Sequence, residues 1–289
     1  MPTREFSYSK ILSYATCPSK YKKRYVEGIY PVAKAKPLSF GYCTSKGFEG
    51  YRTEGTFEAA KNGFKKAWQE DGKVLSIRFD PNNEKDFRTV ERGIEILEDY
   101  IRQYPNDPSQ AVEPEVKFKV EIGKIGNTDI VLVGRIDGII SINNDVCIIE
   151  DKTTSRLGPS YLRILKDSLQ IGLYLYAANE YGLFDIGGKK RTPRCLMNAI
   201  KVHSKEFKYD RDIVIKSASK LIQYRDNALN WIRAIIAAEE TDCFPMNDAD
   251  NLTCTKYSGC EYLPLRYTMG TIRENLLKNE YVERNTEIA

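Results

Sequence analysis

The sequence of 289 residues contains a single histidine, His203. This scarcity excludes zinc sites built from several histidines, the HExxH motif of metalloproteases and phosphoryl chemistry that needs two histidines. Any catalysis would have to use carboxylates, lysines, tyrosines, hydroxyls, cysteines or a metal held by oxygen ligands. His203 itself lies at the end of a predicted strand, remote from the motifs that carry chemistry.

Long apolar runs are also missing. No stretch approaches the roughly 20 apolar residues that a membrane-spanning helix needs, and the opening segment MPTREFSYSK lacks the apolar core of a secretory signal. These absences predict a cytoplasmic protein with no membrane partner. The seven cysteines are an odd number spread along the chain, which argues against a disulfide framework in a reducing compartment.

An excess of charge of one sign is absent as well. Lysine and arginine number 44 and aspartate and glutamate number 40, so the net charge is +4. That total permits a nucleic-acid partner without demanding one. Apolar residues make up 42% of the chain, which is enough for a packed core and argues against overall disorder. The sequence contains no internal repeat, helix-turn-helix or zinc finger, so nothing predicts sequence-specific DNA recognition.

Hydrophobic periodicity predicts helices, then strands, then helices. The first helices are expected at 7–28 (two short helices that meet at Cys17), 38–52, 55–71 and 84–104. Strands are expected at 115–122, 129–142, 145–154 and 192–202, the first three as an antiparallel meander. Two further helices are expected at 160–182, with a break near Lys166–Asp167, and at 212–239.

This order predicts one α/β domain over residues 1–289, with a central mixed sheet flanked by helices. Its expected parts are a helical N-terminal part (1–110), a sheet core (111–210), and a C-terminal helix with a small cysteine-containing cap (211–289).

Charged residues that can carry chemistry lie on two consecutive predicted strands. Glu150 and Lys152 are two residues apart and therefore share one face of their strand, and a hairpin at Asn143–Asn144 would bring Asp137 beside them. Two carboxylates, with the carbonyl of Asp151 as a candidate third ligand, suit Mg²⁺ or Mn²⁺. The lysine would polarise the attacking water or stabilise charge on a phosphate, which is the chemistry of phosphodiester hydrolysis.

The pattern D-x12-E-x-K in consecutive strands resembles the core motif of the PD-(D/E)XK nucleases. Gln170 and Tyr174, one helical turn apart in the next helix, resemble the Q-x3-Y motif of the RecB-like branch. Glu115 resembles the acidic residue that precedes the metal-binding aspartate in that branch. The N-terminal segment SYSKILSYATCPSKYKKRYVEG resembles that of RecB-like phage and CRISPR-associated exonucleases, so the resemblance spans about residues 7–263.

An isolated pattern of this kind is more often a solvated, salt-bridged strand face, but the ordered set of motifs favours the nuclease. The resemblance implies a restriction-endonuclease-like core and a Mg²⁺- or Mn²⁺-dependent DNA exonuclease of recombination, repair or phage DNA processing. It also implies a bacterial protein, or a phage protein in the host cytoplasm. Single-stranded DNA or duplex ends are the implied substrate, with a recombination or annealing protein as a candidate partner.

The resemblance implies a role for each site residue. Asp137 and Glu150 would hold the metal, and Lys152 would assist the attacking water. The remaining catalytic residues would support the metal shell or orient phosphate or base, and these are Glu115, Gln170 and Tyr174. Two alternatives remain open: an endonuclease, and a catalytically impaired DNA-binding protein on the same fold.

Lys46 is a departure from the RecB-like pattern, which places a histidine at this point of an N-terminal helix. A protonated lysine cannot ligate a metal, so one implied ion would be held less tightly. Glu49, one turn further on, could substitute as a metal ligand. Alternatively Lys46 and Glu49 form a surface ion pair, or Lys46 contacts DNA.

Four cysteines resemble, with a second departure, the [4Fe–4S] cluster ligands of many RecB-like exonucleases. Cys17, Cys254 and Cys260 match in context, but Arg266 stands where the last cysteine is expected. Cys243 is an extra thiol that could complete the set, with zinc as the other metal that four cysteines could hold. A vestigial site without metal is the alternative.

Basic and aromatic residues interleave in SKYKKRY, residues 19–25, and GGKKRTPR at 187–194 forms a second basic cluster. The basic residues of the first segment would contact DNA phosphates, and its tyrosines would stack on unpaired bases. The predicted phosphate contacts are Lys20, Lys22, Lys23 and Arg24. The alternative is a solvated helix face with Tyr21 and Tyr25 packed inward.

Overall fold

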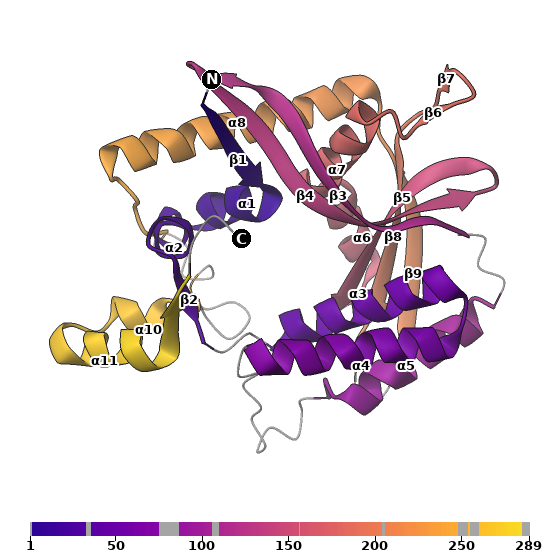
Figure 1. The fold of residues 1–289 in the computed structure, drawn as a ribbon, viewed down its shortest axis with the longest axis horizontal. Coiled ribbons are helices and arrows are strands. Elements are labelled where there is room, and N and C mark those ends of the chain that lie inside the picture. Colours follow the sequence, from indigo (N-terminus) through magenta and orange to yellow (C-terminus); the bar gives the residue numbers. More distant parts are fainter. Residues whose placement is uncertain are drawn as a thin grey trace. The chain divides into compact units, whose positions relative to one another are not determined.

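The computed structural model describes residues 2–32, 36–74, 87–105, 110–155, 157–203, 206–247, 254 and 260–284 (Figure 1). The chain divides into two compact units. The terminal unit comprises Met1–Lys34, Glu121–Val131 and Asp226–Ala289, and the core unit comprises Ala35–Val120 and Leu132–Arg225. The N-terminal 34 residues thus group with the C-terminal part of the chain and not with the helices that follow them. The single domain and its three parts stay a prediction.

A mixed sheet runs in the order β1–β4–β5–β8–β9, and β3 also pairs with β4. Its strands are β1 (Thr3–Ser7), β3 (Gln110–Ile125), β4 (Thr128–Ile142), β5 (Asp145–Thr154), β8 (Arg194–Lys201) and β9 (Lys208–Ile215). β4 is antiparallel to β5, β5 is parallel to β8, and β8 is antiparallel to β9. The predicted α/β architecture with a central mixed sheet is confirmed.

The predicted turn between β4 and β5 is present and explains their register. Asn143 and Asn144 have φ values of 52° and 65°, which asparagine tolerates better than most residues. Two such residues in sequence make the tight turn whose twist matches that of flanking antiparallel strands. The ladder therefore starts at the Ile142–Asp145 pair and continues to the Gly138–Ile149 pair.

The connection from β5 to β8 carries helices because parallel neighbours need a crossover. α6 (Pro159–Lys166) and α7 (Leu169–Glu180) are separated at the predicted break, where Ser168 caps α7 by accepting a hydrogen bond from the Ile171 N–H at 3.3 Å. A small hairpin of β6 (Asp185–Ile186) and β7 (Lys189–Lys190) follows.

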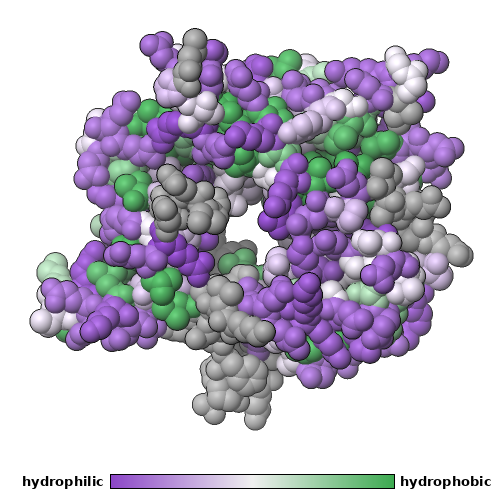
Figure 2. Space-filling model, in the orientation of Figure 1, coloured by the Kyte–Doolittle hydropathy of each residue, from purple (hydrophilic) through white to green (hydrophobic). Residues whose placement is uncertain are grey.

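Three helices of the core unit lie side by side in Figure 1. They are α3 (Lys36–Glu54), α4 (Phe57–Val74) and α5 (Val90–Gln103). Their shared core, which includes a residue of β8, consists of Phe40, Phe48, Phe64, Ile96, Leu97, Tyr100 and Ile200. In Figure 2 the visible surface over α4 and α5 is mainly hydrophilic, as expected for helices with one buried face.

The terminal unit joins the two ends of the described chain. Its N-terminal elements are β1, α1 (Tyr8–Thr16), α2 (Pro18–Tyr21), the π-helix η1 (Lys22–Val26) and β2 (Ile29–Pro31). Its C-terminal elements are the later part of α8 (Ala218–Thr241), α10 (Leu263–Arg266), α11 (Gly270–Glu280) and β10 (Tyr281–Glu283). β2 and β10 pair antiparallel, and Ile29, Tyr262, Leu265 and Tyr281 form a small core around them.

Several predicted boundaries were wrong. Residues 212–215 belong to strand β9, because they pair with β8, and the last long helix starts only at Ala218. The helix predicted from residue 84 begins at Val90, where the Thr89 side chain caps it, and residues 84–86 lie outside the described residues. In the part of the chain that the structure describes, no helix combines the length and apolarity needed to cross a membrane.

We expect Gly172→Ala to destabilise the protein although alanine is the better helix former by about 1 kcal/mol. Gly172 lies inside α7, where an added Cβ would come within 2.2 Å of Cγ in the buried ring of Tyr224. The overpacking should lower the free energy of unfolding by about 1–3 kcal/mol, measured by urea titration. Gly158→Ala is the control, since its Cβ would meet nothing within 4 Å among the described residues. A Gly172→Ala variant as stable as the original protein would contradict this packing.

Candidate active site

The β4–β5 ladder ends where the predicted acidic residues begin. After the Gly138–Ile149 pair, the Asp137 side chain accepts a hydrogen bond from the backbone N–H of Asp151, with 2.8 Å between nitrogen and Oδ2. A carboxylate thus takes the place of a backbone acceptor at this point of the sheet. This bond holds Asp137 against β5, next to Glu150.

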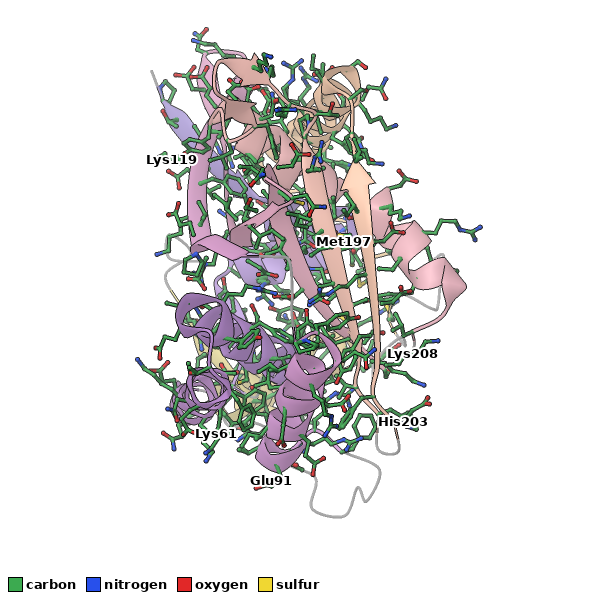
Figure 3. The ribbon with its side chains drawn as sticks, turned by 90° about the vertical axis from the view of Figure 1, so that its right-hand side faces the viewer. Lys61, Glu91, Lys119, Met197, His203 and Lys208 are labelled. Atoms are coloured by element: carbon green, nitrogen blue, oxygen red, sulfur yellow. The ribbon has the colours of Figure 1, made fainter. Side chains whose placement is uncertain are left out.

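Glu150 forms the centre of the site. It is 2% exposed, and its Oε1 accepts hydrogen bonds from the Lys152 ammonium and from Gln170 Nε2, the latter at 2.8 Å. Met197, which pairs with Glu150 in the parallel β5–β8 ladder, lies midway along β8 in Figure 3. The site is therefore in the middle of the sheet, and His203 lies toward the end nearest α5 in the same view.

Tyr174 completes the face formed by α7. Its ring packs edge-on against Phe118 of β3, with 5.5 Å between ring centroids. Burial, and then the charge of Glu150, raise the pKa of the Tyr174 hydroxyl to about 12. The hydroxyl therefore stays protonated at neutral pH and can donate a hydrogen bond.

The charges of the site are closely balanced. Burial, followed by the charges of Glu150 and Asp151, raises the pKa of Asp137 well above its ordinary value. Burial also raises the pKa of Glu150, although Lys152 opposes the effect. Burial alone would lower the pKa of Lys152, but the carboxylates of Glu150 and Asp137 outweigh it and raise that pKa. Lys152 is therefore a cation, and the two acids would ionise more readily beside a further positive charge.

The donor set of Asp137 and Glu150 fits a small divalent cation. Glu150 Oε2 is buried and has no hydrogen-bond partner among the described residues. An unpartnered buried carboxylate oxygen is costly unless something positive approaches it. No cluster of three or more carboxylate, thiol or imidazole side chains suited to a metal occurs in the described segments. Mg²⁺ does not require one, because it binds through one or two carboxylates, waters and substrate phosphates.

Asp151 presents its side chain to the opposite face of β5. Its carboxylate accepts two hydrogen bonds from Arg52 and one from Asn198 Nδ2, each at 2.7 Å. Because these partners hold the carboxylate on the opposite face, only the backbone carbonyl of Asp151 remains a candidate for the predicted metal ligand. Arg52 and Asn198 were missed by the sequence analysis. The strand period places Asp151 opposite Glu150 and Lys152, but nothing in the sequence identifies its partners.

Lys46 forms a separate network with two carboxylates. Its ammonium pairs with Glu49 Oε2 at 2.7 Å and with Glu115, and Glu115 also pairs with Arg135 at 3.2 Å. Burial would raise the pKa of Glu115, but Lys46 and Arg135 outweigh it and lower the pKa. The anticipated pair of Lys46 and Glu49 is thus present. The metal role of Glu49, the supporting role of Glu115 and the DNA contact of Lys46 stay predictions.

The basic residues of 19–25 are all paired with carboxylates. Lys20 and Arg24 lie 3.5 and 3.2 Å from Glu261, Lys22 pairs with Asp242 at 2.7 Å, and Lys23 with Glu27 at 2.6 Å. Tyr21 is buried and donates to Glu239 at 2.9 Å, so this tyrosine packs inward. A phosphate would have to compete with these carboxylates, and the DNA-binding role of the segment stays a prediction.

The cysteines do not supply four thiols to one point among the described residues. Cys254 Sγ lies 3.8 Å from the guanidinium of Arg266, which stands where a cysteine was expected. Burial raises the pKa of Cys260, with a smaller contribution from nearby Cys17, and Cys243 is exposed. A [4Fe–4S] cluster needs four thiolates. No group of three or more thiols that could hold a metal occurs among the described residues, so the iron–sulfur or zinc role and the alternative of a vestigial site both stay predictions.

The site also predicts how Asp137 affects stability. The folded protein holds the Asp137 proton more tightly than the unfolded chain does. Its ionisation therefore costs folding free energy at pH 8, and the cost shrinks as the pH falls toward the ordinary carboxyl pKa of about 4. Asp137→Asn should raise the free energy of unfolding in EDTA by on the order of 1 kcal/mol at pH 8 and by less at pH 5.5.

Urea titrations at the two pH values measure the effect of Asp137→Asn. Added Mg²⁺ should raise the free energy of unfolding of the original protein but not that of the variant. The variant therefore serves as the control for Mg²⁺ binding at Asp137. If Asp137→Asn raises the free energy of unfolding equally at both pH values, or does not raise it, then ionisation of Asp137 does not destabilise the folded protein.

Residues 5–265 match the family model of the PD-(D/E)XK nuclease superfamily. A crystal structure of a protein from Eubacterium rectale, named provisionally as an exonuclease, is similar with a TM-score of 0.50 and 14% identity over 86% of each chain. The structure of SSO0001 has a TM-score of 0.29 and 13% identity over 69% of this chain and 76% of its own. No curated protein matches the sequence.

The matched range agrees with the 7–263 expected from the motifs, and the site residues lie on the strands and helix that the motifs require. The family implies hydrolysis of a nucleic acid. On these grounds the chain belongs to the PD-(D/E)XK nuclease superfamily.

Proposed function

We propose that the protein is a metal-dependent DNA exonuclease. The observation that carries the proposal is the group of Asp137, Glu150 and Lys152 in mid-sheet, in which Glu150 is buried and one of its oxygens has no partner among the described residues. The exonuclease assignment of the similar Eubacterium rectale protein supports the finer choice among nucleases. The RecB-like motifs around Gln170 and Tyr174 support it as well.

Asp137 and Glu150 would hold Mg²⁺ or Mn²⁺. When bound, the ion supplies a Lewis acid for a phosphate oxygen and lowers the pKa of water. Gln170 and Lys152 both bind Glu150 Oε1, and so orient its other oxygen, Oε2, for a cation. The backbone N–H of Asp151 orients Asp137 in the same way.

Lys152 would act as a fixed positive charge. Because the neighbouring carboxylates raise its pKa, it would stabilise charge building on the phosphate and would not take a proton from the water. The protonated hydroxyl of Tyr174 would donate to a phosphate oxygen or a base. Glu115, held by Lys46 and Arg135, would act at the edge of the metal shell.

The proposal is tested by hydrolysis of end-labelled single- and double-stranded DNA in Mg²⁺ or Mn²⁺. Asp137→Ala and Lys152→Ala should each lower the cleavage rate by about 100-fold or more, because each removes charge from the reacting phosphate. Lys61→Ala is the matched control, since Lys61 lies on α4 and pairs with Glu58. Undiminished cleavage by Asp137→Ala or Lys152→Ala would contradict the catalytic role proposed for the residue that was replaced.

Dependence on DNA ends separates an exonuclease from an endonuclease. We expect linear single-stranded DNA to be degraded to nucleotides or short products, and a covalently closed circle of the same sequence to resist. Gel analysis of both substrates with one enzyme preparation measures this. Rapid loss of the circle would establish the endonuclease in place of the exonuclease.

Lys46 is the feature that favours the second candidate, a DNA-binding protein without catalysis. Its ammonium occupies the space between Glu49 and Glu115, where a metal ligand was expected. This candidate predicts DNA binding that weakens with salt and no cleavage in any divalent ion.

A further inference from the structure

Arg52 and Asp151 form an ion pair on the face of β5 that lies opposite Glu150 and Lys152. Arg52 Nη1 and Nη2 donate to Asp151 Oδ2 and Oδ1, both at 2.7 Å. The side chains are 7% and 2% exposed. Two parallel hydrogen bonds from a planar guanidinium fix the rotation of a carboxylate, which a single bond does not.

Asn198 holds the same carboxylate from the neighbouring strand. It is fully buried, pairs with Asp151 in the parallel β5–β8 register, and donates from Nδ2 to Asp151 Oδ1 at 2.7 Å. Asp151 is thus held from α3 by Arg52 and from β8 by Asn198. Its side chain has little freedom to rotate.

The backbone of Asp151 connects this pair to the active site. Its N–H donates to Asp137 Oδ2 at 2.8 Å, on the edge where the β4–β5 ladder has ended. Among the described residues, β5 pairs with β4 only as far as Ile149, so the Asp151 peptide is held by the ladder with β8 and by the contacts of its side chain. The orientation of the Asp137 carboxylate therefore depends on how the Asp151 peptide is held.

Stability alone does not explain a buried ion pair here. Removing a carboxylate and a guanidinium from water costs free energy that their attraction often fails to recover, and apolar residues of similar size frequently serve stability as well. The Arg52 guanidinium lies over the Phe48 ring of its own helix, 5.5 Å from the ring centroid, and α3 is already packed through Phe40 and Phe48 into the apolar core that includes Ile200 of β8. The ion pair does fix the orientation of the Asp151 carboxylate, which contact between two apolar side chains would not do.

We propose that Arg52 is a positioning residue that acts through Asp151 to orient Asp137 for a divalent cation. The inference rests on the proposed function, because it takes Asp137 to be a metal ligand. Arg52 reaches neither substrate nor cation in this role. It fixes the Asp151 side chain, which fixes the Asp151 N–H and with it the carboxylate of Asp137.

Asp137, Glu150 and Asp151 carry three negative charges when ionised, and Lys152 and Arg52 carry two positive charges, so the five groups together have −3 + 2 = −1. Arg52 offsets the charge of Asp151 from the far face of the strand. Asp137, Glu150 and Lys152 together then keep one negative charge, at the site where we propose that a cation binds. A purely electrostatic effect of Arg52 would have the opposite sign to the positioning effect, because Arg52→Gln would leave these groups more negative and strengthen their attraction for a cation.

The test is the affinity for Mn²⁺, measured by isothermal titration calorimetry, with thermal unfolding recorded on the same samples. Arg52→Gln should weaken Mn²⁺ binding by about tenfold or more. Arg52→Lys, which keeps the charge and loses the two-point contact, should weaken it less. It also carries the test if Arg52→Gln does not fold.

Arg194→Gln is the matched control. Arg194 of β8 pairs with Asp145 of β5 at 2.6 Å, at the opposite end of the same two strands. The control should lower the unfolding temperature and leave the Mn²⁺ affinity unchanged. A purely structural role for Arg52 would give the same result as this control and would overturn the proposal.

Asp151→Asn shows whether Arg52 acts through Asp151. The double variant Arg52→Gln with Asp151→Asn should bind Mn²⁺ no more weakly than the Asp151→Asn single variant, because the chain of contacts is already broken. Additive losses would show that Arg52 reaches Asp137 by another route and would overturn the inference.

The metal titration separates this inference from the proposed function. Suppose that the original protein binds Mn²⁺, that Asp137→Asn abolishes this binding, and that no DNA is cleaved. The exonuclease proposal then fails, and the role of Arg52 is still decided by the Mn²⁺ affinity of its variants. If DNA is cleaved but Arg52→Gln binds Mn²⁺ as the original protein does, only this inference fails. Absence of Mn²⁺ binding in the original protein overturns it as well.

Discussion

Three consecutive charged residues on a buried strand are the constraint around which the core unit is organised. Glu150, Asp151 and Lys152 lie in β5, which has β4 and β8 as neighbours. Side chains alternate along a strand, so charge is placed on both faces at once. Each of these charges needs a partner. Lys152 pairs with Glu150 on the same strand, and the other partners come from distant parts of the chain. These are Gln170 of α7 for Glu150, and Arg52 of α3 with Asn198 of β8 for Asp151.

This constraint explains why the site is specific in geometry and costly in stability. The carboxylates of Asp137 and Glu150 are held on neighbouring strands, and burial raises both pKa values. A protein selected only for stability would not keep such a pair. The arrangement is reasonable if a cation and a phosphate complete it. The polar network on the opposite face supplies the rigidity that the site needs.

The helical elements and the motif residues could be predicted to different degrees. The Asn143–Asn144 turn, the break before Ser168 and the shared face of Glu150 and Lys152 follow from local rules and agree with the structure. Strand β9 could not be recognised, because its pairing with β8 is a long-range contact that overrides the periodicity of its apolar residues. Arg52 and Asn198 could not be found for the same reason, since partners 99 and 47 residues from Asp151 in the sequence leave no local signal.

The sequence by itself determined the chemistry available to this protein. Its single histidine excludes sites built from several histidines. Two carboxylates and a lysine at nuclease spacing, with the motifs that follow them, predict a metal held by oxygen ligands and assisted by a cation. Only the tertiary structure decided which residues neutralise the charges on the two faces of β5. It also showed that Lys46 lies between Glu49 and Glu115, and that Arg266 contacts Cys254. The physical reason is that residue spacing fixes side-chain direction along one strand, whereas burial and charge pairing depend on elements that meet only in the folded chain.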